Sequence, residues 1–192
     1  ENITKKSLEL IELGVDSLHC GSWNIEFIKY LSSFKIPFQG HVGLVPMKST
    51  WTGGVKPFGK KSNEAIKIYN DIKQLEELGA WAVEVECVPD KVLAELTKKT
   101  TTLTISIGSG KDTDIQFLFA EDILGHSLID TPRHAKIYRN FNNVFSNLQK
   151  ERVNAFKEFH KDTINKNFND PKITVQIEDK EFDKFLELTE KI

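Results

Sequence analysis

The chain has 192 residues, of which 39% are hydrophobic, 10% aromatic and 28% charged, a composition typical of a globular protein with a sizeable core. Its formal charge of −2 offers no basic surface for nucleic acid or an anionic membrane, and no apolar run approaches the roughly 18 residues of a membrane span. Two cysteines, Cys20 and Cys87, are too few for a disulfide framework and fit a reducing compartment. We therefore expect a cytoplasmic protein without nucleic-acid or membrane partners.

Helix-like and strand-like patterns alternate along the chain. The elements predicted in chain order are a helix over 3–13, a strand over 15–20, a helix over 24–34, a strand over 36–42, a long loop over 43–61, a helix over 62–79, a strand over 81–88, a helix over 90–99, strands over 103–107 and 116–120, a helix over 132–167, a short strand over 173–177 and a helix over 182–188. Repeated strand–helix units indicate parallel strands joined by right-handed crossovers. Five such strands are more than half of a closed eight-stranded barrel, which usually needs about 250 residues.

Four blocks of sequence carry a family resemblance. They are residues 40–46 (GHVGLVP), 53–60 (GGVKPFGK), 79–89 (GAWAVEVECVP) and 105–125, which includes ISIGSG, DIQ and DILG. In this order and spacing, over roughly residues 5–165, they resemble the ketopantoate hydroxymethyltransferases, also called 3-methyl-2-oxobutanoate hydroxymethyltransferases. No single block would be specific enough to indicate the family.

The resemblance implies a fold, a reaction and an assembly. The fold would be α/β, a (β/α)8 TIM barrel of the phosphoenolpyruvate/pyruvate superfamily, with strands four to eight present. Residues 1–167 would form this partial barrel, and residues 168–192 a C-terminal extension with a short strand and a helix. The family transfers a hydroxymethyl group from 5,10-methylenetetrahydrofolate to α-ketoisovalerate, giving ketopantoate for pantothenate synthesis. A magnesium ion holds the 2-oxo acid, and the subunits form a homo-oligomer.

Three residues of this chain match the family's catalytic and substrate-binding positions. By resemblance, Glu86 matches the general base, His41 lies beside the substrate, and His19 occupies the position of a substrate-binding lysine. The position of Glu86 in the sequence also supports a catalytic role, because barrel enzymes place their catalytic residues at the C-terminal ends of parallel strands. A carboxylate partly shielded from water is suited to abstract a proton beside a carbonyl.

The family's metal ligands are not matched. Two are aspartates on strands that this chain does not match, and the third is a glutamate whose position is held by Gly21. No metal ligand is therefore predicted. A zinc cluster of the cysteines with His19 and His41 is disfavoured, because strand alternation turns both cysteines away from these histidines and no C-x2-C pair is present.

Glu84 shares a strand face with Glu86, since side chains alternate along a strand. A buried acid must be paired, neutralised or metal-bound. One hypothesis pairs Glu84 with His19 in place of part of the lost polar site. The alternative is that an incomplete barrel admits water to Glu84.

Two other functions remain open, and so do two local features. The chain could be a divergent 2-oxo acid lyase or aldolase that uses Glu86 without the standard metal, or a catalytically inactive partial barrel that acts only through oligomerisation. Residues 108–110 (GSG) form either a tight turn or a backbone cradle for an anion. The apolar stripe of the predicted helix 132–167 fits a core or a subunit contact.

Overall fold

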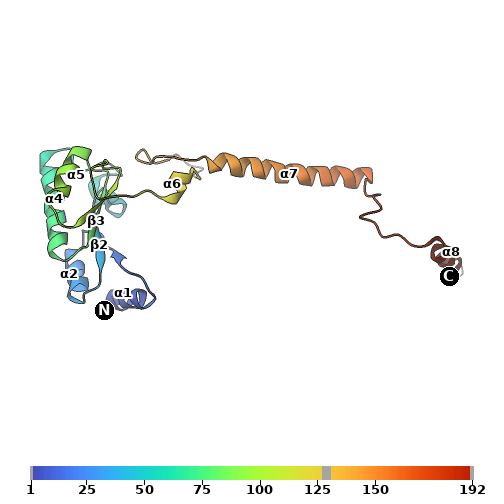
Figure 1. Ribbon diagram of the computed structural model, residues 1–192, viewed down its shortest axis with the longest axis horizontal. Helices are drawn as coiled ribbons and strands as arrows, with labels where there is room; N and C mark the ends of the chain where they lie inside the picture. The colour runs from blue at the N-terminus through green and yellow to red at the C-terminus, as the bar shows by residue number, and fades with distance from the viewer. Residues whose placement is uncertain (1, 127–130, 191–192) are drawn as a thin grey trace. The chain divides into compact units, whose positions relative to one another are not determined.

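The computed structural model describes residues 2–126 and 131–190 and divides into two compact units (Figure 1). One unit runs to Arg139 and the other begins at Asn140. The first unit contains every strand of the described residues and all the residues of the candidate site. The predicted domain boundary at residue 167 lies within the second unit.

A five-stranded parallel sheet organises the first unit. Its strands are β1 (Leu18–His19), β2 (Phe38–Gly43), β3 (Ala82–Glu86), β4 (Leu103–Ile107) and β5 (Ile115–Gln116). They lie side by side in sequence order, and every neighbouring pair is parallel. The C-terminal ends of all five strands therefore meet at one edge of the sheet, as the alternating pattern predicts.

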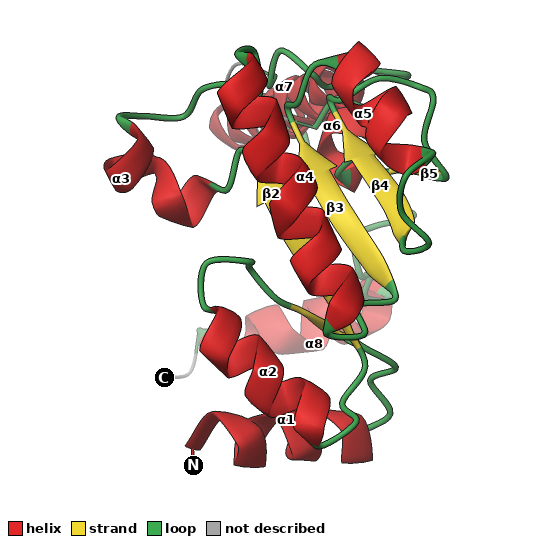
Figure 2. Cartoon of the chain, turned by 90° about the vertical axis from the view of Figure 1, so that its left-hand side faces the viewer, coloured by secondary structure: helices red, strands yellow, loops and turns green. Residues whose placement is uncertain are grey.

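Helices cover one face of this sheet (Figure 2). The helices of the first unit are α1 (Asn2–Glu12), α2 (Ile25–Ser33), the 3-10 helix η1 (Pro46–Lys48), α3 (Ser49–Thr52), α4 (Ser62–Glu77), α5 (Asp90–Thr97) and α6 (Ala120–Leu124). Apolar residues of α2, α4 and α5 pack with alternate residues of β2 and β3 into the core, which includes Ile28, Leu31, Phe38, Val42, Ile72, Leu75, Val83, Val85 and Leu93. The residues between them on β2 and β3 point to the opposite face, where the polar side chains gather.

Close packing fixes β2 against α4. A Cβ at Gly40 would lie 2.5 Å from Cδ1 of Leu75, which is fully buried, so only glycine fits without a shift. Three residues later Gly43 has φ +87°, and a Cβ there would lie 2.3 Å from the Glu86 carbonyl oxygen. Both glycines flank His41 on β2, so this packing determines where His41 lies.

Helix α4 begins and ends as the sequence suggests, although its cap differs from the predicted one. Lys61, rather than the expected Ser62, occupies the N-cap position, and the Glu64 carboxylate accepts hydrogen bonds from the N–H groups of Gly59 and Lys61. The helix ends before Gly79, whose φ of +86° suits the left-handed residue after a helix.

Several predicted elements are shorter than expected. The first strand has two residues instead of six. Strand β5 ends at Gln116, and α6 begins at Ala120, with Glu121 and Asp122 in its first turn. The expected helix over 132–167 begins only at Phe141, because the Asn140 side chain caps it by accepting from the Asn143 N–H. The predicted strand over 173–177 is wrong. Residues 171–178 form turns and coil, and the described strands pair only with one another, in the sheet β1 to β5.

The second unit consists of α7 (Phe141–Asn165), α8 (Asp179–Thr189) and their connection. All its described residues are exposed or half-buried, and the apolar side chains of α7 include Phe145, Leu148, Phe156 and Phe159. Among the described residues, the helices are all too short or too polar to cross a membrane.

Candidate active site

A cavity of about 880 Å³ opens on the face of the sheet that the helices leave uncovered. Strands β1, β2 and β3 supply most of its polar side chains, which include His19, Gln39, His41, Glu84 and Glu86. Its apolar walls include Trp23, Phe27, Ile105, Ile107, Phe117 and Phe119. Such an arrangement, with a few polar groups converging in an apolar pocket, is typical of a small-molecule site.

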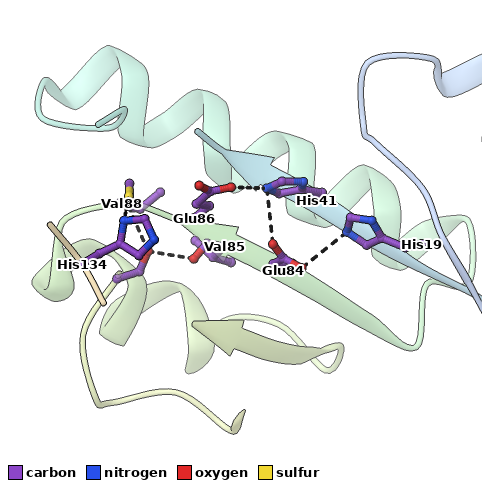
Figure 3. Close-up of polar contacts among 9 residues, drawn as sticks. His19, His41, Glu84, Val85, Glu86, Val88 and His134 are labelled. Atoms are coloured by element: carbon purple, nitrogen blue, oxygen red, sulfur yellow. Dashed lines mark hydrogen bonds and ion pairs between the residues drawn. The ribbon is translucent and has the colours of Figure 1, made fainter. Parts of the chain in front are cut away.

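Glu86 lies at the end of the central strand β3 and is only 8% exposed. Its Oε2 lies 3.1 Å from Nε2 of His41, which is also buried (Figure 3). Because an ionised carboxylate only accepts hydrogen bonds, the His41 N–H donates in this pair. The imidazole therefore orients the carboxylate toward the cavity and satisfies one of its oxygens.

Glu84 belongs to the same row of polar side chains, which consists of His19, Glu84, His41 and Glu86. It pairs in register with His41 on β2, and its two carboxylate oxygens lie 3.6 Å from His41 Nε2 and 3.5 Å from His19 Nε2 (Figure 3). Burial raises the pKa of Glu84, but the contact with His19 and the charges of both histidines outweigh it, so this pKa lies below its usual range. Of the two readings of Glu84, the structure shows the hypothesised pair with His19 and adds His41 to it.

Backbone contacts from two neighbouring segments hold the end of β3. The Leu44 N–H donates to the Glu86 carbonyl at 2.8 Å. The buried Ser109 hydroxyl donates to the Val85 carbonyl at 2.7 Å and accepts from the Val88 N–H at 2.9 Å. The GSG segment therefore forms a tight turn in which the serine has a structural role. In the sequence, the turn is indicated by a serine between two glycines.

The two cysteines each follow the last residue of a strand, and Cys20 also lines the first cavity. Cys20 is buried in the core on the helix side. Cys87 has φ +52°, in the left-handed region, and its Sγ lies 3.5 Å from Nδ1 of His134. Burial raises the pKa of the Cys87 thiol, and the Glu86 charge raises it further. The contact with His134 was not predicted, because the two residues are 47 positions apart in sequence.

A second cavity, of about 820 Å³, shares Glu86 with the first. The cationic side chains of Lys56, Lys60 and Arg133 are among its lining residues, together with Cys87 and His134. Glu86 therefore lines both cavities. The first has apolar walls and the polar side chains of β1–β3, and the second has cationic side chains that suit an anionic ligand.

The side chains of this row do not fit the magnesium ion that the family resemblance implies. His19, His41 and Glu84 each offer one atom, and these atoms lie within 4.8 Å of one another. Two of the three are imidazole nitrogens, whereas magnesium prefers oxygen ligands in octahedral geometry. Gly21, which the family resemblance places at the position of a glutamate ligand, has no side chain to offer. We therefore derive no step of the reaction through magnesium.

Comparison with known proteins gives one consistent result. The family model described as ketopantoate hydroxymethyltransferase matches residues 3–171. The chain is 36% identical to the 3-methyl-2-oxobutanoate hydroxymethyltransferase of Buchnera aphidicola subsp. Acyrthosiphon pisum (strain 5A) over 76% of its own length and 55% of the relative's. It is 31% identical to the enzyme of that name from Kosmotoga olearia, over 89% of this chain and 62% of the relative. The chain spans about half the length of the curated relatives it matches.

Proposed function

Because the chain belongs to the ketopantoate hydroxymethyltransferase family, we propose that it carries the base and substrate pocket of a 3-methyl-2-oxobutanoate hydroxymethyltransferase. The reaction would transfer a hydroxymethyl group from 5,10-methylenetetrahydrofolate to α-ketoisovalerate, giving ketopantoate for pantothenate synthesis. The observation that carries this proposal is the buried Glu86 carboxylate, oriented by His41 at the C-terminal end of the central parallel strand. The comparisons do not favour the lyase or the inactive-barrel alternative.

Glu86 acts as the general base in this proposal. Its carboxylate takes the C3 proton of the 2-oxo acid. Water releases the one-carbon unit of the donor as formaldehyde, which breaks both carbon–nitrogen bonds and leaves tetrahydrofolate. The enolate carbon then adds to the formaldehyde carbon, and the formaldehyde oxygen takes up a proton and becomes the hydroxyl group of ketopantoate. General-base catalysis requires a base within hydrogen-bond reach of the proton, and Glu86 lines the cavity that would hold the substrate. His41 keeps the carboxylate in place, and His19, half-exposed at the rim, is suited to contact the substrate's carboxylate.

The second cavity suits the folate donor. Methylenetetrahydrofolate ends in carboxylates, and Lys56, Lys60 and Arg133 would complement their charge. Since Glu86 lines both cavities, the proposed arrangement brings the deprotonated carbon and the one-carbon unit to the same side chain.

Further features of the family complete the proposal. We assign the five parallel strands to strands four to eight of the family's TIM barrel. Homo-oligomers would form through the exposed apolar stripe of α7, in which Phe156 is 75% exposed. Free cysteines Cys20 and Cys87 are compatible with action in the reducing cytoplasm.

Turnover with a matched pair of variants tests the function. Ketopantoate formation from α-ketoisovalerate and methylenetetrahydrofolate is measured by mass spectrometry for the unmodified chain, Glu86→Gln and Glu77→Gln. Glu77 is exposed on α4 and serves as the control. The proposal predicts product from the unmodified chain and the control, and a loss of about 10² or more for Glu86→Gln. Absence of product from the unmodified chain, or full activity of Glu86→Gln, would contradict it.

A further inference from the structure

We propose that His134 is the acid–base residue that releases the one-carbon unit of methylenetetrahydrofolate in the second cavity, with Cys87 as its positioning residue. The inference rests on the proposed function and adds a residue to it. Glu86 removes a proton from carbon, whereas release of the one-carbon unit needs a group that gives a proton to nitrogen and takes one from water.

Close packing brings His134 to the end of β3. Its Nδ1 lies 3.5 Å from Sγ of Cys87, which directly follows Glu86, the last residue of the strand. Gly108 has φ +67°, and a Cβ at this position would lie 2.5 Å from Cβ of His134, so the histidine needs a glycine beside it. His134 and Glu86 both line the second cavity, and His134 lies at the Glu86 end of the polar row (Figure 3).

The contact with Cys87 selects the ring nitrogen that exchanges protons. Burial and the Glu86 charge raise the pKa of the Cys87 thiol, so this thiol stays protonated and does not act as a base itself. Its sulfur is a weak acceptor that orients the His134 ring through Nδ1. Nε2 is then the atom that would exchange a proton with a ligand. Imidazole suits this task, because it gains and loses a proton near neutral pH.

The remaining walls of the second cavity suit the donor that His134 would act on. The cavity volume of about 820 Å³ lies in the range of sites that hold small organic ligands. Arg133, the residue before His134, lines it together with Lys56 and Lys60, and these cations complement the donor's carboxylates. The side chain of Glu86 lines the same cavity, so formaldehyde would be released beside the proposed base.

The proton balance of the release fits one histidine. Protonated His134 gives its Nε2 proton to one nitrogen of the donor as the first carbon–nitrogen bond breaks, and the electron pair of the second nitrogen forms a double bond to the carbon. Neutral His134 then takes a proton from water as the water oxygen bonds to this carbon. The second carbon–nitrogen bond breaks as the new hydroxyl proton moves to the second nitrogen. Formaldehyde and tetrahydrofolate result, and His134 has regained its proton.

Three assays separate this step from the step of Glu86. Exchange of isotopically labelled formaldehyde into methylenetetrahydrofolate, followed by NMR without any 2-oxo acid, reports release. Hydrogen exchange at C3 of α-ketoisovalerate reports proton removal, and ketopantoate formation from added formaldehyde bypasses release. We expect the unmodified chain to accelerate formaldehyde exchange, and His134→Ala and His134→Gln to lose a factor on the order of 10². The other two rates should stay within about twofold. His160→Ala, exposed on α7, should change none of the three.

Rescue distinguishes proton transfer from a structural role. Added imidazole should restore formaldehyde exchange in His134→Ala, whereas it would not repair a packing defect. Cys87→Ser keeps an acceptor for Nδ1 and should release formaldehyde near the unmodified rate, while Cys87→Ala should lose about tenfold. Circular dichroism confirms that each variant is folded.

Four results would overturn the role of His134. They are formaldehyde exchange that the unmodified chain does not accelerate, unchanged exchange in His134→Ala, a loss that imidazole does not restore, and an equal loss of C3 hydrogen exchange in the same variant. Absence of C3 hydrogen exchange with the unmodified chain, while formaldehyde exchange proceeds, would instead contradict the proposed role of Glu86 and support that of His134.

Discussion

The contact between Gly40 and Leu75 predicts a compensating pair of substitutions. A methyl group at position 40 would lie 2.5 Å from Leu75 Cδ1, inside a fully packed interface between β2 and α4. Gly40→Ala should therefore destabilise the chain by about 1–3 kcal/mol through overpacking. Leu75→Ala should cost about 2–5 kcal/mol, because it removes a fully buried side chain and leaves a cavity.

The double variant decides whether the contact is real. In Gly40→Ala/Leu75→Ala the new methyl group enters the space that the leucine vacates, so the loss should be about 1 kcal/mol or more below the sum of the single losses. Urea unfolding followed by circular dichroism measures each free energy of unfolding. Ile66→Ala, on the exposed side of the same helix, should cost under about 0.5 kcal/mol and add to Gly40→Ala without coupling. Strict additivity of Gly40→Ala and Leu75→Ala would refute this packing of β2 on α4.

Two further predictions concern stability. The Glu76 carboxylate accepts from Lys73 and from the N–H and hydroxyl of Thr101, and these bonds lower its pKa from 4.5 to about 2. Glu76→Gln should reduce the free energy of unfolding at pH 7 by about 1–2 kcal/mol, allowing for solvent screening. These bonds stabilise only the ionised form of Glu76, so the difference in unfolding free energy between Glu76→Gln and the unmodified chain should shrink as the pH falls from 4.5 to 2. A difference that does not depend on pH would contradict this role of Glu76. Ser109→Ala removes the partner of the buried Val88 N–H and should cost about 1–3 kcal/mol in urea unfolding, whereas a loss below about 0.5 kcal/mol would show that Ser109 does not hold this turn.

Strand alternation predicted most of the candidate site. Glu84 and Glu86 are separated by one residue on a strand, so they had to share a face, and the same parity pointed His19 to that face. His41 was placed there by the family resemblance. The structure brings all four together in one cavity. Parallel register, which places His41 directly beside Glu84, is a tertiary property and could not be read from the spacing.

Elements held by tertiary contacts were predicted less well. The strand expected over 173–177 has the right alternation, but Val175 is fully exposed, because alternation alone provides no partner strand. Residues 132–140 continue the helical pattern of α7, yet the Asn140 cap begins the helix later. The contact of Cys87 with His134 depends on how a distant segment returns to the end of β3, which no local pattern encodes.

Hydrogen exchange at C3 of α-ketoisovalerate tests the central claim most directly, because it isolates proton removal from the one-carbon transfer. The substrate is incubated with the chain in deuterium oxide, and loss of the C3 proton signal is followed by NMR. Exchange should be accelerated by the unmodified chain and by Glu77→Gln, and reduced by a factor on the order of 10² or more in Glu86→Gln. Exchange by Glu86→Gln at the rate of the unmodified chain would show that Glu86 is not the base.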